Sequence, residues 1–228
     1  MPIGNQCINL GKSIMLEIEK LVLGPVATNT YLVADTDSKK AVIIDPAWDG
    51  DVLAKKVRQL GWEIQSVWLT HAHFDHFGGL ADLLTGLDLT TQDDFFVGLH
   101  PRDMNLWKIK GGAILFGVTL KSAPRPTHEF QEGELLSVGK YEFQVHHTPG
   151  HSSGHVIFHC ESERILFSGD LIFKQGIGRT DLLGGSFSTL MESIQRYVLP
   201  LPDETRIYSG HGPETTVGEE RQENPFLK

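Results

Sequence analysis

Cysteine and long apolar runs are both scarce in this chain. Its 228 residues include two cysteines, Cys7 and Cys160, and no Cys-x-x-Cys pair. A fold built on disulfides is therefore excluded, and a reducing, cytoplasmic location is favoured. No apolar run approaches the roughly 20 residues that a membrane-spanning helix needs. Residues 1–14 also lack the basic start and apolar centre of a secretory signal, so no membrane partner is expected.

Positive charge is also in short supply. Lysine and arginine total 20 against 29 aspartate and glutamate residues, which gives a formal net charge of −9. Proteins that bind nucleic acid concentrate lysine and arginine against the phosphates, and this chain does not. Nucleic acid is therefore not expected as a partner.

The apolar residues that are present suffice for one substantial core. They make up 40% of the chain, and the length fits one domain, expected over residues 15–228. Residues 1–14 are interpreted as an N-terminal extension, disordered in this interpretation. Residues 104–134, interrupted by Gly and Pro, are interpreted as a loop that forms a wall or lid of the active site. Strands are expected at 16–23, 30–34, 41–44, 64–69, 95–99, 135–138, 141–146, 156–159, 164–167 and 206–208, the first three antiparallel, and helices at 52–60, 80–84 and 186–198.

The most informative stretch is Thr70–Gly79, which follows a strand-like run and precedes a helix-like one. It holds three histidines and an aspartate: His71, His73, Asp75 and His76. Side chains two apart on an extended backbone point the same way, so His71 and His73 can bind one cation. Asp75 and His76, after a kink, turn toward a second. The spacing therefore predicts a metal site that can serve two ions.

Three later strand ends offer ligands of the same kinds. His151, Asp170 and His211 each follow an apolar strand and have glycine neighbours. A rigid sheet presents ligands from its end in this way. Asp170 is expected to be shared by both metals, because a carboxylate has two oxygens with which to bridge them. Asp45 also ends a strand, where it either orients a ligand histidine or caps a turn before proline.

Four segments together resemble the metallo-β-lactamase superfamily, in its glyoxalase II-like branch: Thr70–Gly79, Thr148–Gly154, Ser168–Asp170 and Ser209–Pro213. The ending, with Gly210-His211-Gly212-Pro213 and Asn224-Pro225-Phe226-Leu227, is similar to the short bacterial hydroxyacylglutathione hydrolase-like members. The resemblance implies an α/β fold, a four-layer αββα sandwich in a single domain. It also implies a first metal bound by His71, His73 and His151, a second bound by Asp75, His76 and His211, Asp170 as the bridge, and Asp45 behind a ligand histidine.

One departure concerns the substrate. Full-length glyoxalase II enzymes carry a C-terminal helical domain that binds glutathione, and this chain is expected to lack one. Lys174 and Arg179 are the basic residues nominated to bind an anionic substrate. Arg179 could instead form an ion pair with Asp181.

The ligand set suggests both cofactor and reaction. Mixed histidine and carboxylate ligation suits zinc and tolerates iron or manganese, so two divalent ions are expected, with zinc the first candidate. The hypothesis is hydrolysis of a thioester such as S-lactoylglutathione by a hydroxide that bridges the two metals. Asp75 and Asp170 are then the catalytic carboxylates. The expected partner is accordingly a small-molecule thioester or a related substrate.

Two other functions stay open. A persulfide dioxygenase of the same fold would bind a single iron through His71, His151 and Asp170. A non-catalytic metal-binding or redox-partner module is the other alternative, although seven candidate ligands favour an enzyme.

The remaining histidines are not expected to bind metal. His100 is interpreted as a capping or surface residue, and His128 as a surface residue without a companion. His147 and His155 could support the ligand histidines or be polar residues at strand ends.

Overall fold

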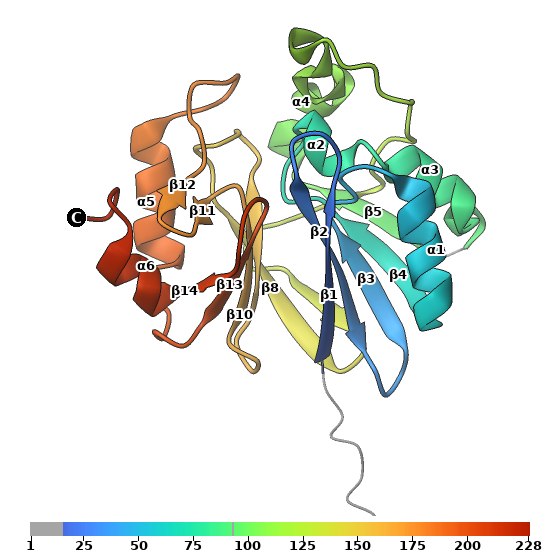
Figure 1. Ribbon diagram of the computed structural model, residues 1–228, viewed down its shortest axis with the longest axis horizontal. Coiled ribbons are helices and arrows are strands. Elements are labelled where there is room, and N and C mark those ends of the chain that lie inside the picture. The colour runs from blue at the N-terminus through green and yellow to red at the C-terminus, as the bar shows by residue number, and fades with distance from the viewer. Residues whose placement is uncertain (1–15, 93) are drawn as a thin grey trace, which may run out of the picture.

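The structure, a computed structural model, describes residues 16–92 and 94–228 (Figure 1). Within these residues, two six-stranded sheets face each other in the middle of the molecule, and helices cover the outer face of each. The predicted four-layer αββα sandwich is therefore confirmed. The predicted extension at residues 1–14 lies outside the described residues.

The first sheet begins antiparallel and continues parallel. β1, β2 and β3 are antiparallel neighbours, as predicted, whereas β3, β4, β5 and β6 follow one another in parallel. Parallel neighbours place their carboxyl ends at the same edge of the sheet. The strands are β1 (Leu16–Leu23), β2 (Thr28–Asp35), β3 (Lys40–Ile44), β4 (Glu63–Trp68), β5 (Phe96–Leu99) and β6 (His128–Glu129).

The second sheet repeats this mixture. β7, β8, β9 and β10 are antiparallel neighbours, β10 and β13 are parallel, and β14 closes the edge. A small hairpin of β11 (Ile172–Phe173) and β12 (Gly176–Ile177) follows β10. The strands of the sheet are β7 (Leu135–Val138), β8 (Tyr141–His147), β9 (Val156–Cys160), β10 (Ile165–Gly169), β13 (Arg206–Ser209) and β14 (Thr215–Thr216).

Alternation along the strands sorts the core into layers. In β2, Tyr31 and Val33 lie between the two sheets, whereas Leu32 and Ala34 face the helices outside. β10 divides in the same way, with Phe167 between the sheets and Leu166 under the opposite helices. Because strand side chains alternate in direction, a strand buried on both faces reads as a continuous apolar run.

The helices have the faces and ends that their sequences predict. α1 (Gly50–Leu60) buries Leu53, Ala54 and Val57 and ends at Gly61 in the left-handed region, while α5 (Phe187–Tyr197) begins at Ser186, whose hydroxyl accepts from the Thr189 amide. The others are α2 (Phe74–Phe77), α3 (Leu80–Gly86), α4 (Met104–Lys108) and α6 (Val217–Glu223), of which only α3 was predicted. In the described part of the chain, no helix is both long and apolar enough to cross a membrane.

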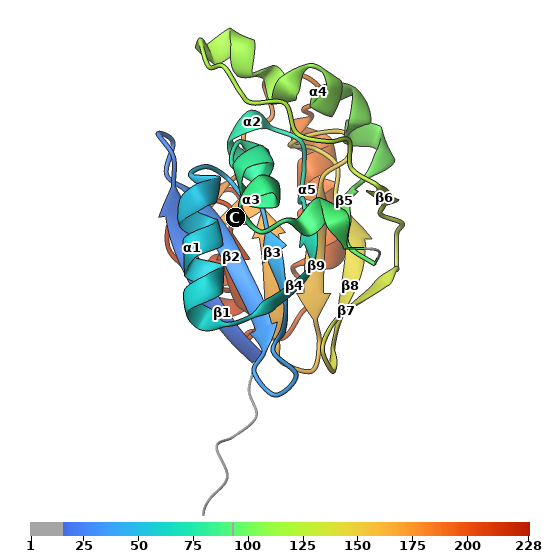
Figure 2. The same cartoon turned by 90° about the vertical axis from the view of Figure 1, so that its right-hand side faces the viewer.

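The segment 104–134 is more ordered than the sequence suggests. It holds α4, a run of tight helical turns at Lys110–Phe116 and β6. Gly111 and Gly112 have positive φ angles, which breaks the helical pattern that sequence reading looks for. Figure 2 shows α4 and the following turns above α2, over one end of the sheets. The segment therefore does lie as a wall beside the predicted site.

Candidate metal centre

The predicted ligands meet at one edge of the sandwich. β3 and β4 are parallel, as are β10 and β13, so residues that follow these strands emerge on the same side of their sheets. His71 follows β4, Asp170 follows β10 and His211 follows β13, while His151 lies in the connection between β8 and β9. Both sheets therefore contribute to one cluster of histidine and aspartate side chains.

His71, His73 and His151 form the first part of this cluster. The three side chains are buried, and their ligand atoms lie within 4.8 Å of one another. His151 Nε2 is 3.2 Å from His71 Nε2 and 2.8 Å from His73 Nδ1. Three imidazoles that share one point in this way form a donor set for a transition metal.

Asp75, His76 and His211 form the second part. His76 Nε2 lies 3.6 Å from Asp75 Oδ2, which in turn lies 3.3 Å from His211 Nε2. Asp170 lies between the two parts. Its Oδ1 is 3.4 Å from His76 Nε2, and its Oδ2 is 3.5 Å from His151 Nε2 and 3.7 Å from His211 Nε2. The two oxygens of Asp170 therefore face different histidines, as a bridging carboxylate requires.

Two buried atoms indicate that a cation fits this cluster. In the described part of the chain, His76 Nε2 and Asp170 Oδ1 have no hydrogen-bond partner although both are buried. Unsatisfied buried polar atoms are costly and rare. Donors bound to one tetrahedral zinc at about 2.1 Å lie roughly 3.4 Å apart, which resembles the spacing of these two atoms. The residues present therefore fit a divalent metal.

The histidines of the first part are held in the form that binds metal. Burial, together with the neighbouring imidazoles, lowers the pKa of His71 well below its usual value, and burial and His151 lower the pKa of His73 to about 3. Burial also lowers the pKa of His151. Metal binding requires neutral imidazole, so these three side chains need not lose a proton at neutral pH.

The second part has the opposite electrostatics. Burial alone would lower the pKa of His76, but the carboxylates of Asp170, Asp75 and Asp45 raise it well above its usual value. In the same way, burial would raise the pKa of Asp75, but His76 and His211 lower it to about 2. Positive charge is therefore attracted to this position, as a cation would be.

Asp45 orients His76 and anchors its loop. Its Oδ2 lies 2.8 Å from His76 Nδ1 and accepts from the Thr70 hydroxyl, and its Oδ1 accepts from the Thr70 amide. A proton on Nδ1 leaves the Nε2 lone pair of His76 free to face the cluster. His151 is oriented similarly, with Nδ1 2.8 Å from the Arg179 carbonyl oxygen. Of the two interpretations of Asp45, the structure favours the orienting role.

Asp103 ties two ligand loops together, and sequence reading missed it. Its carboxylate is buried and accepts from the Ala72 amide, the Ser152 hydroxyl and the Gly154 amide at 2.6–2.9 Å. The loops of His71 and His151 are thus fixed by one side chain. The available signal was its position shortly after β5, a third parallel strand whose carboxyl end lies at the same edge.

Other residues support single ligands. His155 is buried, with Nδ1 2.9 Å from the Thr148 hydroxyl, and its Nε2 accepts from the Asp170 amide at 3.0 Å. Asn29 holds the His211 loop, because its amide donates to the carbonyls of Ser209 and Gly212. Position 210 requires glycine, because a Cβ there would overlap Asp170 Oδ1 and lie 2.7 Å from His76.

The remaining histidines lie outside the cluster. Of the two interpretations of His100, capping is confirmed: its buried ring accepts from the Arg102 amide and stacks on His147, with 4.0 Å between the ring centroids. His128 does have a companion, since its Nε2 lies 2.5 Å from the Glu134 carboxylate. Glu134 ends the 104–134 segment and His147 ends β8, and the sequence pattern revealed neither contact.

The two nominated basic residues differ in position. Arg179 lines the pocket beside the cluster and forms a two-point ion pair with Asp181 at 2.8 Å, which is the alternative that the sequence left open. Lys174 lies 3.5 Å from Glu219 and is not among the described residues that line this pocket. The nomination of Lys174 as a substrate contact therefore lacks structural support.

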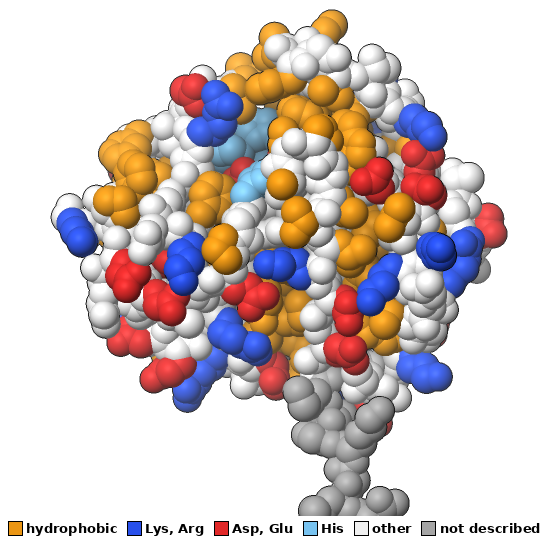
Figure 3. Space-filling view, viewed as in Figure 1, with side chains coloured by type: hydrophobic (Ala, Val, Ile, Leu, Met, Phe, Trp, Pro, Cys, Tyr) orange, Lys and Arg blue, Asp and Glu red, His pale blue; other side chains and the backbone are white. Residues whose placement is uncertain are grey.

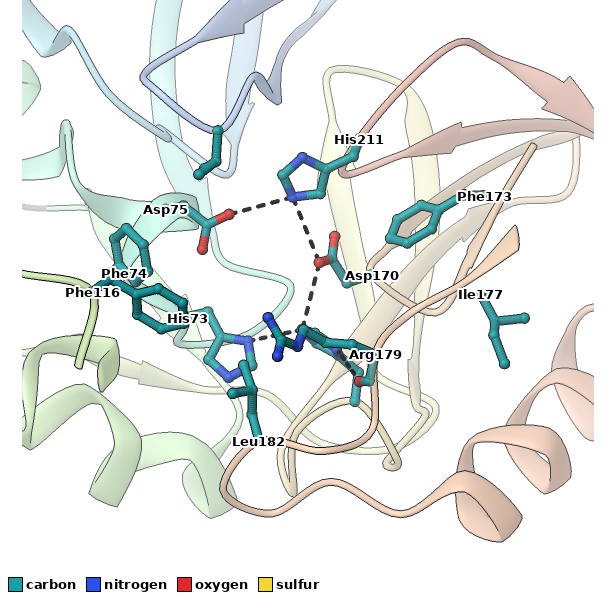
Figure 4. Close-up of a pocket in the computed structure, with 12 residues that line it drawn as sticks. His73, Phe74, Asp75, Phe116, Asp170, Phe173, Ile177, Arg179, Leu182 and His211 are labelled. Atoms are coloured by element: carbon teal, nitrogen blue, oxygen red, sulfur yellow. Dashed lines mark hydrogen bonds and ion pairs between the residues drawn. The ribbon is translucent and has the colours of Figure 1, made fainter. Parts of the chain in front are cut away.

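A pocket of about 350 Å³ opens beside the ligand cluster. Figure 3 shows histidine side chains in a hollow in the upper part of the molecule, with hydrophobic side chains around it. In Figure 4, His73, Asp75, Asp170 and His211 point into this pocket. The cluster is therefore accessible to a small molecule, as a catalytic metal must be.

Comparison with known families agrees with this geometry. Residues 23–211 match the model of the metallo-beta-lactamase superfamily. The chain belongs to this superfamily. Among its relatives, the probable metallo-hydrolase YqgX of Bacillus subtilis is 35% identical and covers 91% of this chain and 96% of its own. The hydroxyacylglutathione hydrolase GloC of Haemophilus influenzae is also 35% identical, over 93% of this chain and 98% of its own.

Solved structures of the superfamily share the whole sandwich. The BLEG-1 B3 metallo-beta-lactamase is 38% identical, with a TM-score of 0.84 over 92% of this chain and 99% of that one. TTHA1623, solved in a di-iron-bound form, is 40% identical, with a TM-score of 0.82 over 92% and 100%. ETHE1 from Myxococcus xanthus is 28% identical, with a TM-score of 0.71 over 92% and 83%. One of these structures of similar fold, TTHA1623, is thus metal-bound.

Proposed function

We propose that this chain is a dinuclear metal-dependent hydrolase that cleaves thioesters such as S-lactoylglutathione. The observation that carries the proposal is the position of Asp170, whose carboxylate lies between the two sets, near His151 of the first and near His76 and His211 of the second. His71, His73 and His151 would hold one ion, and Asp75, His76 and His211 the other. Zinc suits this donor set, and the di-iron form of TTHA1623 supports iron as an alternative.

The side chains around the pocket have defined roles in this proposal. When bound, two such cations supply an ionised water near neutral pH and an electrophile for a carbonyl oxygen. Asp75 would hold the second ion and Asp170 would contact both, and Asp45 keeps His76 Nε2 directed at the cluster. Among the described residues that line the pocket, the titratable side chains are the candidate ligands and Arg179. No separate general base is therefore assigned, and a thiolate leaves without a strong general acid.

Metal content and two assays test the proposal together. The purified protein is expected to bind two metal ions per chain, to hydrolyse S-lactoylglutathione and to show no oxygen uptake with glutathione persulfide. His211→Ala is expected to lose the second ion and at least about a hundredfold in kcat/KM, because it removes one ligand of that ion. His159→Ala, a histidine away from the cluster, is the matched control and should change neither. A His211→Ala variant that keeps both ions and full activity would contradict the dinuclear assignment.

A persulfide dioxygenase is the second candidate. It would use one iron bound by His71, His151 and Asp170. The similarity to ETHE1 and to the di-iron-bound TTHA1623 supports this alternative. The complete second set of Asp75, His76 and His211 supports the hydrolase instead. One iron per chain with oxygen uptake would reverse this preference.

The location in the cell and the class of partner are part of the proposal. The scarcity of cysteine supports a cytoplasmic location, and the acidic balance supports a small-molecule partner over nucleic acid. Localisation of a tagged chain and binding assays with a DNA duplex test these two points.

A further inference from the structure

The pocket beside the ligand cluster has an apolar lining that the proposed thioester chemistry does not require. Apart from the candidate ligands and Arg179, the described residues that line it are all apolar: Val26, Phe74, Phe116, Phe173, Ile177 and Leu182. Hydroxide attack needs the metal side of the pocket only. The apolar residues must therefore have another function, and the first to consider is selection of the substrate.

These apolar side chains come from five separate parts of the chain. Phe74 and Phe116, whose ring centroids are 5.2 Å apart, stand on one side of the ligands in Figure 4, and Phe173 and Ile177 stand on the other. Val26 comes from the turn between β1 and β2, and Leu182 from the loop before α5. A surface assembled from this many segments is a feature of the tertiary structure and not of one accidental apolar loop.

Several of these side chains are exposed to water. Val26 and Phe116 are 46% and 48% exposed, and Ile114, Leu115 and Leu183, sequence neighbours of the lining residues Phe116 and Leu182, are 83%, 78% and 68% exposed. Large apolar side chains grouped at a pocket mouth are typical of a site that binds an apolar ligand or a protein surface. Figure 3 shows hydrophobic side chains along much of the border of the hollow that contains the histidines, with basic and acidic side chains at its upper left.

Charge in the pocket does not suit a strongly anionic substrate. Arg179 is the sole lysine or arginine among the described lining residues, and both of its contacting nitrogens already bind the Asp181 carboxylate. The dicarboxylate of glutathione would need cations that this wall does not offer. Lys174, the basic residue that precedes Arg179 in the sequence, lies 3.5 Å from Glu219 instead.

We propose that the apolar wall binds a hydrophobic acyl group, so that the preferred substrates are thioesters of apolar acids of several carbons and not short hydroxyacyl thioesters. The inference rests on the proposed hydrolase function and adds the class of acyl group to it. The acyl carbonyl lies at the ligand cluster, and the chain extends between the Phe74–Phe116 pair and the β11–β12 hairpin. A volume of about 350 Å³ accommodates a chain of this size.

An acyl series on one small, uncharged thiol tests the proposal. The metal-replete protein is assayed with the S-acetyl, S-butanoyl and S-hexanoyl thioesters of N-acetylcysteamine. Each buried methylene is expected to raise kcat/KM by about fourfold until the pocket is filled. Calorimetry with the thioether S-hexyl-N-acetylcysteamine, which cannot be hydrolysed, measures the same contact without turnover. It should bind more tightly than the S-ethyl compound.

Single substitutions assign the acyl preference to particular side chains of the pocket. Phe116→Ala is expected to lower the hexanoyl-to-acetyl ratio of kcat/KM by about tenfold and to weaken S-hexyl binding, because half of the aromatic pair is lost. Leu135→Ser removes another exposed apolar side chain, from β7 and away from the pocket, and should leave the ratio unchanged. Arg179→Ala should leave the preference for the longer chain intact.

The outcomes distinguish this inference from the function on which it rests. If no thioester is hydrolysed although two metals are bound, the proposed function itself is wrong. If S-lactoylglutathione is hydrolysed but the acyl series is flat, only the apolar-acyl inference is overturned. It is overturned equally if Ile114→Ser changes the sedimentation coefficient while Phe116→Ala leaves the ratio untouched, because the pocket mouth is then an interface between two copies of the chain.

Discussion

At the scale of single residues, the candidate metal centre depends on side chains that never touch the pocket. Asp45 orients His76, His155 binds the Asp170 amide, and Asp103 joins the loops of His71 and His151. Each of these contacts fixes a ligand by a hydrogen bond to its ring or its backbone. Second contacts of this kind commonly change metal affinity by 10- to 100-fold when removed, by order of magnitude.

Asp103→Ala tests this dependence. The change leaves the buried amides of Ala72 and Gly154 without an acceptor, so we expect the free energy of unfolding to fall by about 3 kcal/mol. Metal affinity should fall roughly tenfold or more, because both ligand loops are released. Urea denaturation and competition with a chelating dye measure the two effects. Asp94→Ala, at an exposed aspartate, is the control, and equal behaviour of the two variants would show that Asp103 has no special role.

At the scale of secondary-structure elements, α6 supports the pocket through the β11–β12 hairpin that lines it. Glu220 of α6 is buried and accepts from the Gln175 amide at 2.8 Å, the Thr215 hydroxyl at 2.6 Å and the Asn224 side chain at 2.8 Å. Gln175 lies in the turn of the β11–β12 hairpin, whose Phe173 and Ile177 line the pocket. The last helix thus fixes a hairpin that faces the candidate ligands.

Glu220→Ala is expected to loosen this hairpin and leave the metal ligands in place. KM for a thioester should rise several-fold with metal content unchanged, and the free energy of unfolding should fall by about 2 kcal/mol as buried donors lose their acceptor. Steady-state kinetics, metal analysis and urea denaturation give the three values. Glu192→Ala, an exposed glutamate on α5, is the matched control. A loss of metal in the Glu220 variant with KM unaltered would contradict the assignment.

At the scale of the whole molecule, the buried histidines make stability depend on pH. The pKa is lowered for His71, His73, His100, His151, His155 and His159, in each case chiefly by burial, and raised for His76 and His211. The pKa of His73 is about 3 in the folded protein and 6.5 in the unfolded chain. At a pH between these two values, His73 binds a proton only after unfolding. Its stabilising contribution is present above pH 6.5 and is lost as the pH falls toward 3.

The metal-free protein is therefore expected to be less stable at pH 5 than at pH 7. His73 alone should contribute a loss of about 2 kcal/mol over this interval, and His76 and His211 oppose the trend because their folded pKa values are raised. Urea denaturation at the two pH values, in the presence of a chelator, measures the change. His73→Gln should reduce the difference, and a stability that rises on acidification would refute the argument.

Local sequence determined the strands and the ligand motif. In β2 and β10 the apolar runs predict buried strands, and the spacing of His71, His73, Asp75 and His76 predicts metal ligands on a strand and the kink after it. Such features depend on neighbours within a few residues, which periodicity and spacing can report. Their convergence with His151, Asp170 and His211 was expected from strand ends, and the structure brings these side chains together.

Only the tertiary structure decided what surrounds that motif. Asp103 looks like an ordinary aspartate after proline until β5 joins β4 in parallel and brings it to the Ala72 amide. Val26, Phe116 and Leu182 are unremarkable apolar residues in turns, and they become one wall because three loops from distant parts of the chain meet at the sheet edge. Contacts between segments far apart in sequence do not change the spacing of apolar residues within either segment, so sequence periodicity does not reveal them. For this reason the sequence by itself determined the candidate metal ligands, and the fold decided the shape and polarity of the space beside them.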